Sequence, residues 1–166
     1  MKHLLFLAAA LVFVSGFAGC AKKSDQLTTG VDGDYVVGTP LSERRDGSAF
    51  FSDKVIKGKF EPVYFGYDSF EVSDQQLVNV GQVADALRGM KNDIIIAGFT
   101  DDRGTEEYNR VLGEKRALAV RQALIGLGVN AGRIQTVSFG MEMPADPGSG
   151  DAAWAKNRRA EFGIIK

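Results

Sequence analysis

The 166-residue chain suits one ordinary domain plus appendages, and its 20 Lys and Arg residues nearly balance 21 Asp and Glu residues. That balance gives no reason to expect a nucleic-acid partner, because phosphate backbones are bound by a surplus of Lys and Arg. The only histidine is His3 and the only cysteine is Cys20.

The first twenty residues have the three parts of a secretory signal peptide, predicted over residues 1–19. The positively charged start is followed by a nearly unbroken apolar run over residues 4–17, and then by small residues directly before Cys20. The run is shorter than the roughly 20 residues that span a bilayer. Removal of this leader takes away the only imidazole, which excludes Ser-His-Asp and Cys-His catalysis and the usual His/Cys zinc sites.

Residues 17–20 (Phe-Ala-Gly-Cys) resemble a bacterial lipobox, in which diacylglycerol is attached to the cysteine before cleavage. The resemblance implies that Cys20 becomes an acylated N-terminus, although Phe17 replaces the usual Leu. A lone cysteine has no intramolecular disulfide partner. Several acyl chains anchor stably, at roughly 0.8 kcal/mol per buried methylene. Because Ala21 and not Asp follows the cysteine, the resemblance also implies sorting to the outer membrane.

Residues 20–60 are predicted to comprise the acylated Cys20 and a flexible linker. Gly, Ser, Thr, Asp and Lys recur there without a sustained apolar period. The folded domain is predicted to occupy residues 61–166, held at a distance from the membrane by the linker.

The first half of this domain is predicted to form a strand, a helix and a second strand. Residues 62–67 are aromatic and β-branched, and residues 94–98 form a short apolar run, both typical of strands. A helix is predicted to follow Ser73 and to end at Gly89, with Ser73 and Gln76 as a capping box. Its predicted apolar face consists of Leu77, Val80, Ala84 and Leu87.

The second half alternates in the same way. A long helix is predicted over residues 105–127, capped by Thr105, followed by a strand at residues 134–139. A short helix at residues 152–158 and a last strand at residues 159–165 complete the pattern, with Gly163 unusual inside a strand. The order β-α-β-α-β-α-β predicts an α+β domain of two layers, with helices packed on a mixed parallel and antiparallel sheet.

The long helix carries polar residues on its buried side. Asn109, Leu112, Arg116 and Val120 follow one another at intervals of three or four and therefore share a face. Arginine is seldom placed on an apolar stripe unless something pairs with it. The partner of Arg116 is predicted to be either Asp101, in the turn before the helix, or a carboxylate of a ligand.

Residues 98–117 (Gly-Phe-Thr-Asp-Asp-Arg-Gly-Thr-Glu-Glu-Tyr-Asn-Arg-Val-Leu-Gly-Glu-Lys-Arg-Ala) strongly resemble the signature of the OmpA-like C-terminal domain, in the version found in peptidoglycan-associated lipoproteins. Residues 63–68, 138–144 and 157–160 resemble three further motifs of that family. The four motifs occur in the family's order, and the resemblance covers residues 61–166.

The resemblance implies that the domain binds the peptide stem of peptidoglycan by gripping meso-diaminopimelate, which offers carboxylates and an ammonium group. Carried over by position, Asp101 accepts the ammonium group and Arg116 pairs with a carboxylate in bidentate geometry. Asn109 adds a hydrogen bond, and Asp68 and Arg158 are further expected contacts. No catalytic residue, cofactor or metal is implied, so we expect a binding protein and not an enzyme.

The same resemblance implies an outer-membrane lipoprotein whose domain faces the periplasm and tethers the membrane to the cell wall. TolB and other Tol proteins are then expected partners, in a Tol-Pal system for envelope integrity and cell division. The alternative is an envelope lipoprotein whose head mainly binds another periplasmic protein. Phe99 stands where the family commonly has His. If that position contacts the ligand, the replacement alters binding; if it is a packing position, the replacement has little effect.

Three other interpretations of these residues compete with a site for the peptidoglycan stem peptide. Asp101 and Asp102 could cap the long helix and pair with Arg103, without any ligand. A calcium loop is disfavoured, because the acidic residues of this turn lack the alternating spacing and the sixth-position glycine of an EF-hand. A glycan hydrolase using two carboxylates would have to choose them from Glu61, Asp68 and Asp101.

Overall fold

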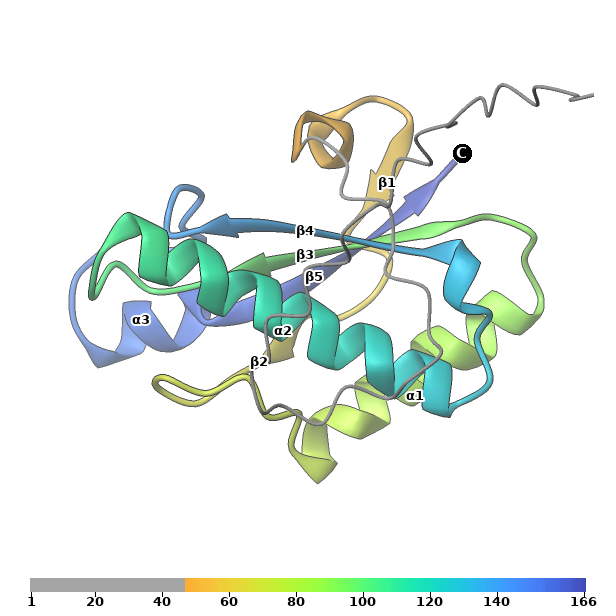
Figure 1. The fold of residues 1–166 in the computed structure, drawn as a ribbon, viewed down its shortest axis with the longest axis horizontal. Helices are drawn as coiled ribbons and strands as arrows, with labels where there is room; N and C mark the ends of the chain where they lie inside the picture. The colour runs from red at the N-terminus through yellow and green to blue at the C-terminus, as the bar shows by residue number, and fades with distance from the viewer. Residues whose placement is uncertain (1–46) are drawn as a thin grey trace, which may run out of the picture. The chain divides into compact units, whose positions relative to one another are not determined.

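The computed structural model describes residues 47–166 (Figure 1). The predicted signal peptide, Cys20 and the linker as far as residue 46 therefore lie outside the described residues. Within the described part, no helix has the length and apolar character needed to cross a membrane. The elements in chain order are η1 (Gly47–Phe51), β1 (Val55–Lys57), β2 (Val63–Tyr64), α1 (Asp74–Arg88), β3 (Ile94–Phe99), α2 (Glu106–Gly126), η2 (Ala131–Arg133), β4 (Ile134–Gly140), α3 (Asp151–Asn157) and β5 (Arg159–Ile165).

The strands form one mixed sheet in the order β1-β5-β3-β4, and β2 pairs with the other end of β5. Strands β3 and β4 run parallel, whereas β5 is antiparallel to β1, β2 and β3. Helices α1 and α2 cover one face of the sheet, and α3 lies beyond the end where β3 and β4 finish (Figure 1). The predicted α+β class with a mixed sheet is confirmed.

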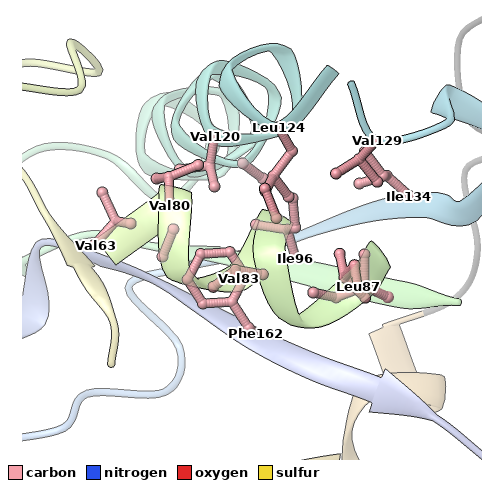
Figure 2. Close-up of a cluster of buried hydrophobic side chains, with 14 of the residues drawn as sticks. Val63, Val80, Val83, Leu87, Ile96, Val120, Leu124, Val129, Ile134 and Phe162 are labelled. Carbon is pink, nitrogen blue, oxygen red and sulfur yellow. The ribbon is translucent and has the colours of Figure 1, made fainter. Parts of the chain in front are cut away.

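The main core fills the space between the two long helices and the sheet (Figure 2). Val80 and Leu87 of α1 and Val120 of α2 pack there with Ile96 and Phe162 from the sheet. Alternate residues of β3 point to the opposite face, where they form a second cluster. Strand β3 is thus apolar throughout because both of its faces are covered.

The predicted apolar face of α1 is right at three positions and wrong at one. Val80, Ala84 and Leu87 are buried, but Leu77 is 40% exposed and Val83 is buried instead. Positions 80, 83, 84 and 87 repeat at three and four residues, which keeps one stripe of the helix against the core. Leu77 lies one turn earlier, at the solvent-facing start of the helix.

The capping box predicted for α1 does not form. Ser73 is the N-cap, but its side chain makes no capping hydrogen bond, and Gln76 Oε1 instead accepts the backbone N–H of Tyr64 at 3.1 Å. Gln76 thereby ties α1 to β2. The cap predicted for α2 is confirmed, since the hydroxyl of Thr105 accepts the N–H of Tyr108 at 3.2 Å.

The folded part of the chain begins earlier than the predicted boundary at residue 61. Strand β1 pairs with β5, and Phe50 of η1 is fully buried on the sheet face opposite the two long helices. Gly163 makes room for both, because a Cβ there would lie 2.4 Å from Val55 Cγ1 and 3.1 Å from Phe50 Cε2. The first predicted strand, in contrast, shortens to Val63–Tyr64.

Helix α2 approaches β3 most closely where two glycines face each other. A Cβ on Gly98 would lie 1.9 Å from the carbonyl oxygen of Gly113, and a Cβ on Gly113 would lie 2.5 Å from Ser138 Oγ. Neither position has room for a methyl group, so this contact fixes the distance between α2 and the sheet. Asn109 and Arg116 lie one turn to either side of Gly113.

Substituting Gly98→Ala should therefore lower the free energy of unfolding by about 3 kcal/mol, because the added methyl group forces α2 away from β3. Urea denaturation measures this difference. Gly81→Ala, inside α1, is the matched control. A Cβ there meets nothing within 4 Å, so we expect a gain of about 0.5–1 kcal/mol from helix propensity. Equal effects of the two substitutions would contradict the steric argument.

Candidate functional site

The loop after β2, the turn after β3 and the first turns of α2 meet at one end of the sheet. They enclose a cavity of about 260 Å³. Four of the five predicted site residues line it: Asp68, Asp101, Asn109 and Arg116. The fifth, Arg158, lies behind Asp101 and outside the cavity lining.

Arg116 is fully buried and is held by backbone carbonyl groups. Its Nε donates to Ser69 O at 2.8 Å, its Nη1 to Phe99 O at 2.8 Å, and its Nη2 to Gly66 O at 3.1 Å. The three acceptors belong to the loop after β2 and to the end of β3, so one side chain on α2 joins three parts of the fold. The ring of Phe65 lies 5.2 Å from the guanidinium carbon.

No carboxylate within the described residues lies within 4.0 Å of Arg116, so its charge has no close counter-ion there. A guanidinium group has five N–H donors, and the three carbonyl groups take three of them. Burial lowers the pKa of Arg116 to about 10, against the opposing influence of Asp101. The group remains a cation at neutral pH.

Asp101 is buried and paired with two arginines. Its Oδ2 accepts Arg103 Nη2 at 2.6 Å and Arg158 Nη1 at 3.3 Å, and its Oδ1 accepts the backbone N–H of Arg103 at 3.3 Å. Of the pairings considered from the sequence, the one with Arg103 is present and the one with Arg116 is not. Burial alone would raise the pKa of Asp101, but the hydrogen bonds from Arg103 and Arg158 outweigh it and lower the pKa. A lowered pKa does not suit a general acid.

Arg103 also forms one wall of the cavity, a role that the sequence patterns did not indicate. Its guanidinium carbon lies 4.0 Å from the ring centroid of Tyr67 and 4.2 Å from that of Trp154. The backbone carbonyl of Arg103 accepts Asn109 Nδ2 at 3.0 Å. The buried Asn109 thus fixes the turn between β3 and α2 from the helix side.

Asp68 occupies the rim of the cavity in an uncommon backbone conformation, with φ of 50°. The hydroxyl of Tyr108 donates a hydrogen bond to its Oδ1. Arg158 lies elsewhere: its Nε donates to Phe65 O at 3.0 Å while its Nη1 reaches Asp101. Arg158 therefore supports the loop after β2 and the Asp101 carboxylate.

The side chain of Phe99 packs away from the cavity. Its ring stacks on Phe139 at 5.4 Å, within the cluster on the sheet face opposite α1 and α2, and Arg159 lies 3.9 Å above it. Only its carbonyl oxygen reaches the site, through Arg116. In this chain, position 99 is thus a packing position.

The cavity is lined by a buried cation, Arg116, without a close counter-ion in residues 47–166, and by the carboxylates of Asp68 and Asp101. Such a pattern suits a small ligand that carries both a carboxylate and an ammonium group. No group of three or more His, Cys, Asp or Glu residues suited to a metal ion occurs in residues 47–166.

Comparison with known proteins gives a consistent family assignment. The OmpA family matches residues 64–158. A peptidoglycan-associated lipoprotein of Pseudomonas aeruginosa is 35% identical over 98% of this chain and 97% of its own length. One from Haemophilus influenzae is 41% identical over 63% of this chain and 69% of its own.

Solved structures agree with the sequence relatives. The peptidoglycan-associated lipoprotein from Burkholderia pseudomallei is 46% identical, with a TM-score of 0.59 over 63% of this chain and 87% of that chain. The C-terminal domain of Helicobacter pylori MotB is 25% identical, with a TM-score of 0.60 over 64% of this chain and 84% of that chain.

The pairing of Asp101 predicts a pH-dependent contribution to stability. Because its pKa is lowered in the folded state, the contribution is present above the unfolded-state pKa and is lost as the pH falls through the folded-state value. We expect Asp101→Asn to lower the free energy of unfolding by about 1–3 kcal/mol at pH 7. The difference should shrink in acid, below about pH 4.

Chemical denaturation across this pH range measures the effect. Asp102→Asn is the matched control, because Asp102 is the exposed neighbour in the same turn. A destabilisation by Asp101→Asn that stays constant down to pH 2 would show that the charge of Asp101 does not stabilise the turn.

Proposed function

This chain belongs to the OmpA family, and we propose that it is an outer-membrane lipoprotein whose folded domain binds peptidoglycan without chemically changing it. The ligand is proposed to be the meso-diaminopimelate residue of the stem peptide. A relative that matches 98% of this chain is named a peptidoglycan-associated lipoprotein. This match supports a role in binding the cell wall.

The observation that carries this proposal is the state of Arg116. A buried guanidinium group without a close carboxylate is energetically costly, so an anion that pairs with it is bound favourably. Two of its N–H donors make no hydrogen bond to the described residues, and the side chain lines the cavity. A ligand carboxylate that enters the cavity would therefore complete both the charge and the hydrogen bonding of Arg116.

The other residues are assigned roles around that contact. The carboxylates of Asp68 and Asp101 form the side of the cavity that attracts the ammonium group of diaminopimelate. Asn109 supplies polar contact from the same face of α2, and Arg158 holds Asp101 in place. Binding of this kind needs no nucleophile, cofactor or metal, which agrees with a role other than catalysis.

The proposed cellular role is a tether. Acyl chains on Cys20 would hold the outer membrane, the segment that follows would give reach, and the domain would grip the wall from the periplasmic side. A partnership with TolB and other Tol proteins, in envelope integrity and cell division, is proposed on family membership.

Binding should depend on the ligand carboxylate. We expect a stem peptide with meso-diaminopimelate to bind at least about 30-fold more tightly than the same peptide with lysine, because lysine keeps the ammonium group but leaves the buried Arg116 unpaired. Isothermal titration calorimetry measures both affinities on the unchanged protein. Equal affinities would remove Arg116 from the binding site.

Substitutions give the complementary test. Arg116→Ala or Asp101→Ala should each weaken binding by about 2–5 kcal/mol, since each leaves an opposite charge unpaired. Thermal unfolding must accompany this titration, because Arg116 also joins three parts of the fold. If folded variants of both residues bound the peptide as the unchanged protein does, the cavity would not be the peptidoglycan site.

Anchoring is predicted to depend on Cys20. Cys20→Ser removes the thiol that diacylglycerol requires, so the protein should move from the outer-membrane fraction to a soluble or unprocessed form. Fractionation of cells and metabolic labelling with a fatty acid measure this change. Retention of labelled, membrane-bound Cys20→Ser protein would contradict acylation at this residue.

A further inference from the structure

A hydrogen bond at the rim of the cavity links α2 to the loop after β2. The hydroxyl of Tyr108, in the first turn of α2, donates to Oδ1 of Asp68, and both residues line the cavity. None of the roles assigned above requires Tyr108. The contact therefore calls for an explanation of its own.

The two carboxylates of the cavity differ in how their charge is balanced. Asp101 accepts hydrogen bonds from two arginines, at 2.6 and 3.3 Å. Asp68 has no cation within 4.0 Å among residues 47–166, and only the neutral hydroxyl of Tyr108 bonds to its carboxylate there. Asp68 is thus the carboxylate that still lacks a positive partner.

The backbone of Asp68 and its side chain are held by different groups. Arg116 binds the carbonyl oxygens of Gly66 and Ser69, on either side of Asp68, and so fixes the loop. The backbone adopts φ of 50°, a conformation in which Asp is one of the few residues tolerated. Removing the hydroxyl of Tyr108 would consequently free the carboxylate but leave the loop in place.

Tyr108 is well placed to act as a fixed donor. Its own N–H is bound by the N-cap Thr105, which anchors the first turn of the helix. The hydrogen bond to Asp68 raises the pKa of Tyr108, so the hydroxyl stays protonated at neutral pH. A carboxylate has two oxygens and about four acceptor sites, so Oδ2 of Asp68 remains free for a second donor.

We propose that Tyr108 is a positioning residue that holds the carboxylate of Asp68 so that its free oxygen receives the ammonium group of the ligand. Asp101 remains paired with its two arginines and adds its charge to the side of the cavity that attracts the ammonium group. This inference rests on the proposed function, since it assigns the two charges of the same amino-acid ligand to Asp68 and Arg116.

A double-mutant cycle tests the inference, with calorimetric titration of the full-length protein by the diaminopimelate stem peptide. Tyr108→Phe should weaken binding by about 3- to 10-fold, because the ligand must then order a free side chain. Asp68→Asn should weaken it further. In the Asp68→Asn background, Tyr108→Phe should have no additional effect, because the residue acts through Asp68.

A second peptide separates positioning from a purely structural role. Acetylating the free amine of diaminopimelate removes the ammonium group, so Tyr108→Phe and the unchanged protein should bind this peptide equally weakly. Tyr64→Phe is the matched control, since Tyr64 lies outside this cavity and is also exposed. It should bind both peptides as the unchanged protein does.

The outcomes distinguish the two proposals. If the unchanged protein fails to bind the diaminopimelate peptide, the proposed function fails and this inference fails with it. If the unchanged protein binds but Tyr108→Phe binds equally well, only the inference is overturned. The inference is also overturned if Tyr108→Phe weakens binding equally with and without the Asp68 carboxylate. The same holds if Tyr108→Phe weakens binding of the acetylated peptide as much as that of the unmodified peptide.

Discussion

The burial of one arginine among backbone carbonyl groups is the constraint on which this end of the domain depends. Carbonyl dipoles from Gly66, Ser69 and Phe99 solvate the guanidinium group of Arg116 well enough for the domain to fold around it. They do not neutralise its charge, since no carboxylate of the described residues is close. The hydrogen bonds of Arg116 thus join α2 to the end of β3 and to the loop after β2. The same side chain lines the cavity with its positive charge.

The two carboxylates that line the cavity differ in how their charges are balanced. Asp101 is neutralised by Arg103 and Arg158, which keeps the turn between β3 and α2 in place. In the part of the chain that the structure describes, Asp68 has no cation within 4.0 Å, and its carboxylate accepts a hydrogen bond from the hydroxyl of Tyr108. Within residues 47–166, the charge of Asp101 is thus balanced by close cations, whereas Asp68 and Arg116 have no close partner of opposite charge. The close contact between Gly98 and Gly113 fixes the distance between α2 and β3.

The sequence predicted the long buried elements well, because their burial produces a regular apolar period. It placed Asn109 and Arg116 on the buried face of α2 for the same reason. It missed η1 and β1. The packing of Phe50 of η1 on the sheet and the pairing of β1 with β5 depend on the space that Gly163 leaves more than one hundred residues later. The carbonyl partners of Arg116 also escaped prediction, because backbone acceptors leave no mark in the sequence. The predicted capping box does not form because the side chain of Gln76 instead accepts a hydrogen bond from the backbone of β2.

Selectivity at such a site comes mainly from the penalty for the wrong ligand. A neutral or purely cationic group in a cavity of about 260 Å³ would leave the buried Arg116 without an anion. An anion without an ammonium group would meet the uncompensated Asp68. An amino acid bearing both charges avoids both penalties at once. The proposed discrimination therefore rests on two opposite charges of one cavity, Asp68 and Arg116, that have no close partner of opposite charge within residues 47–166.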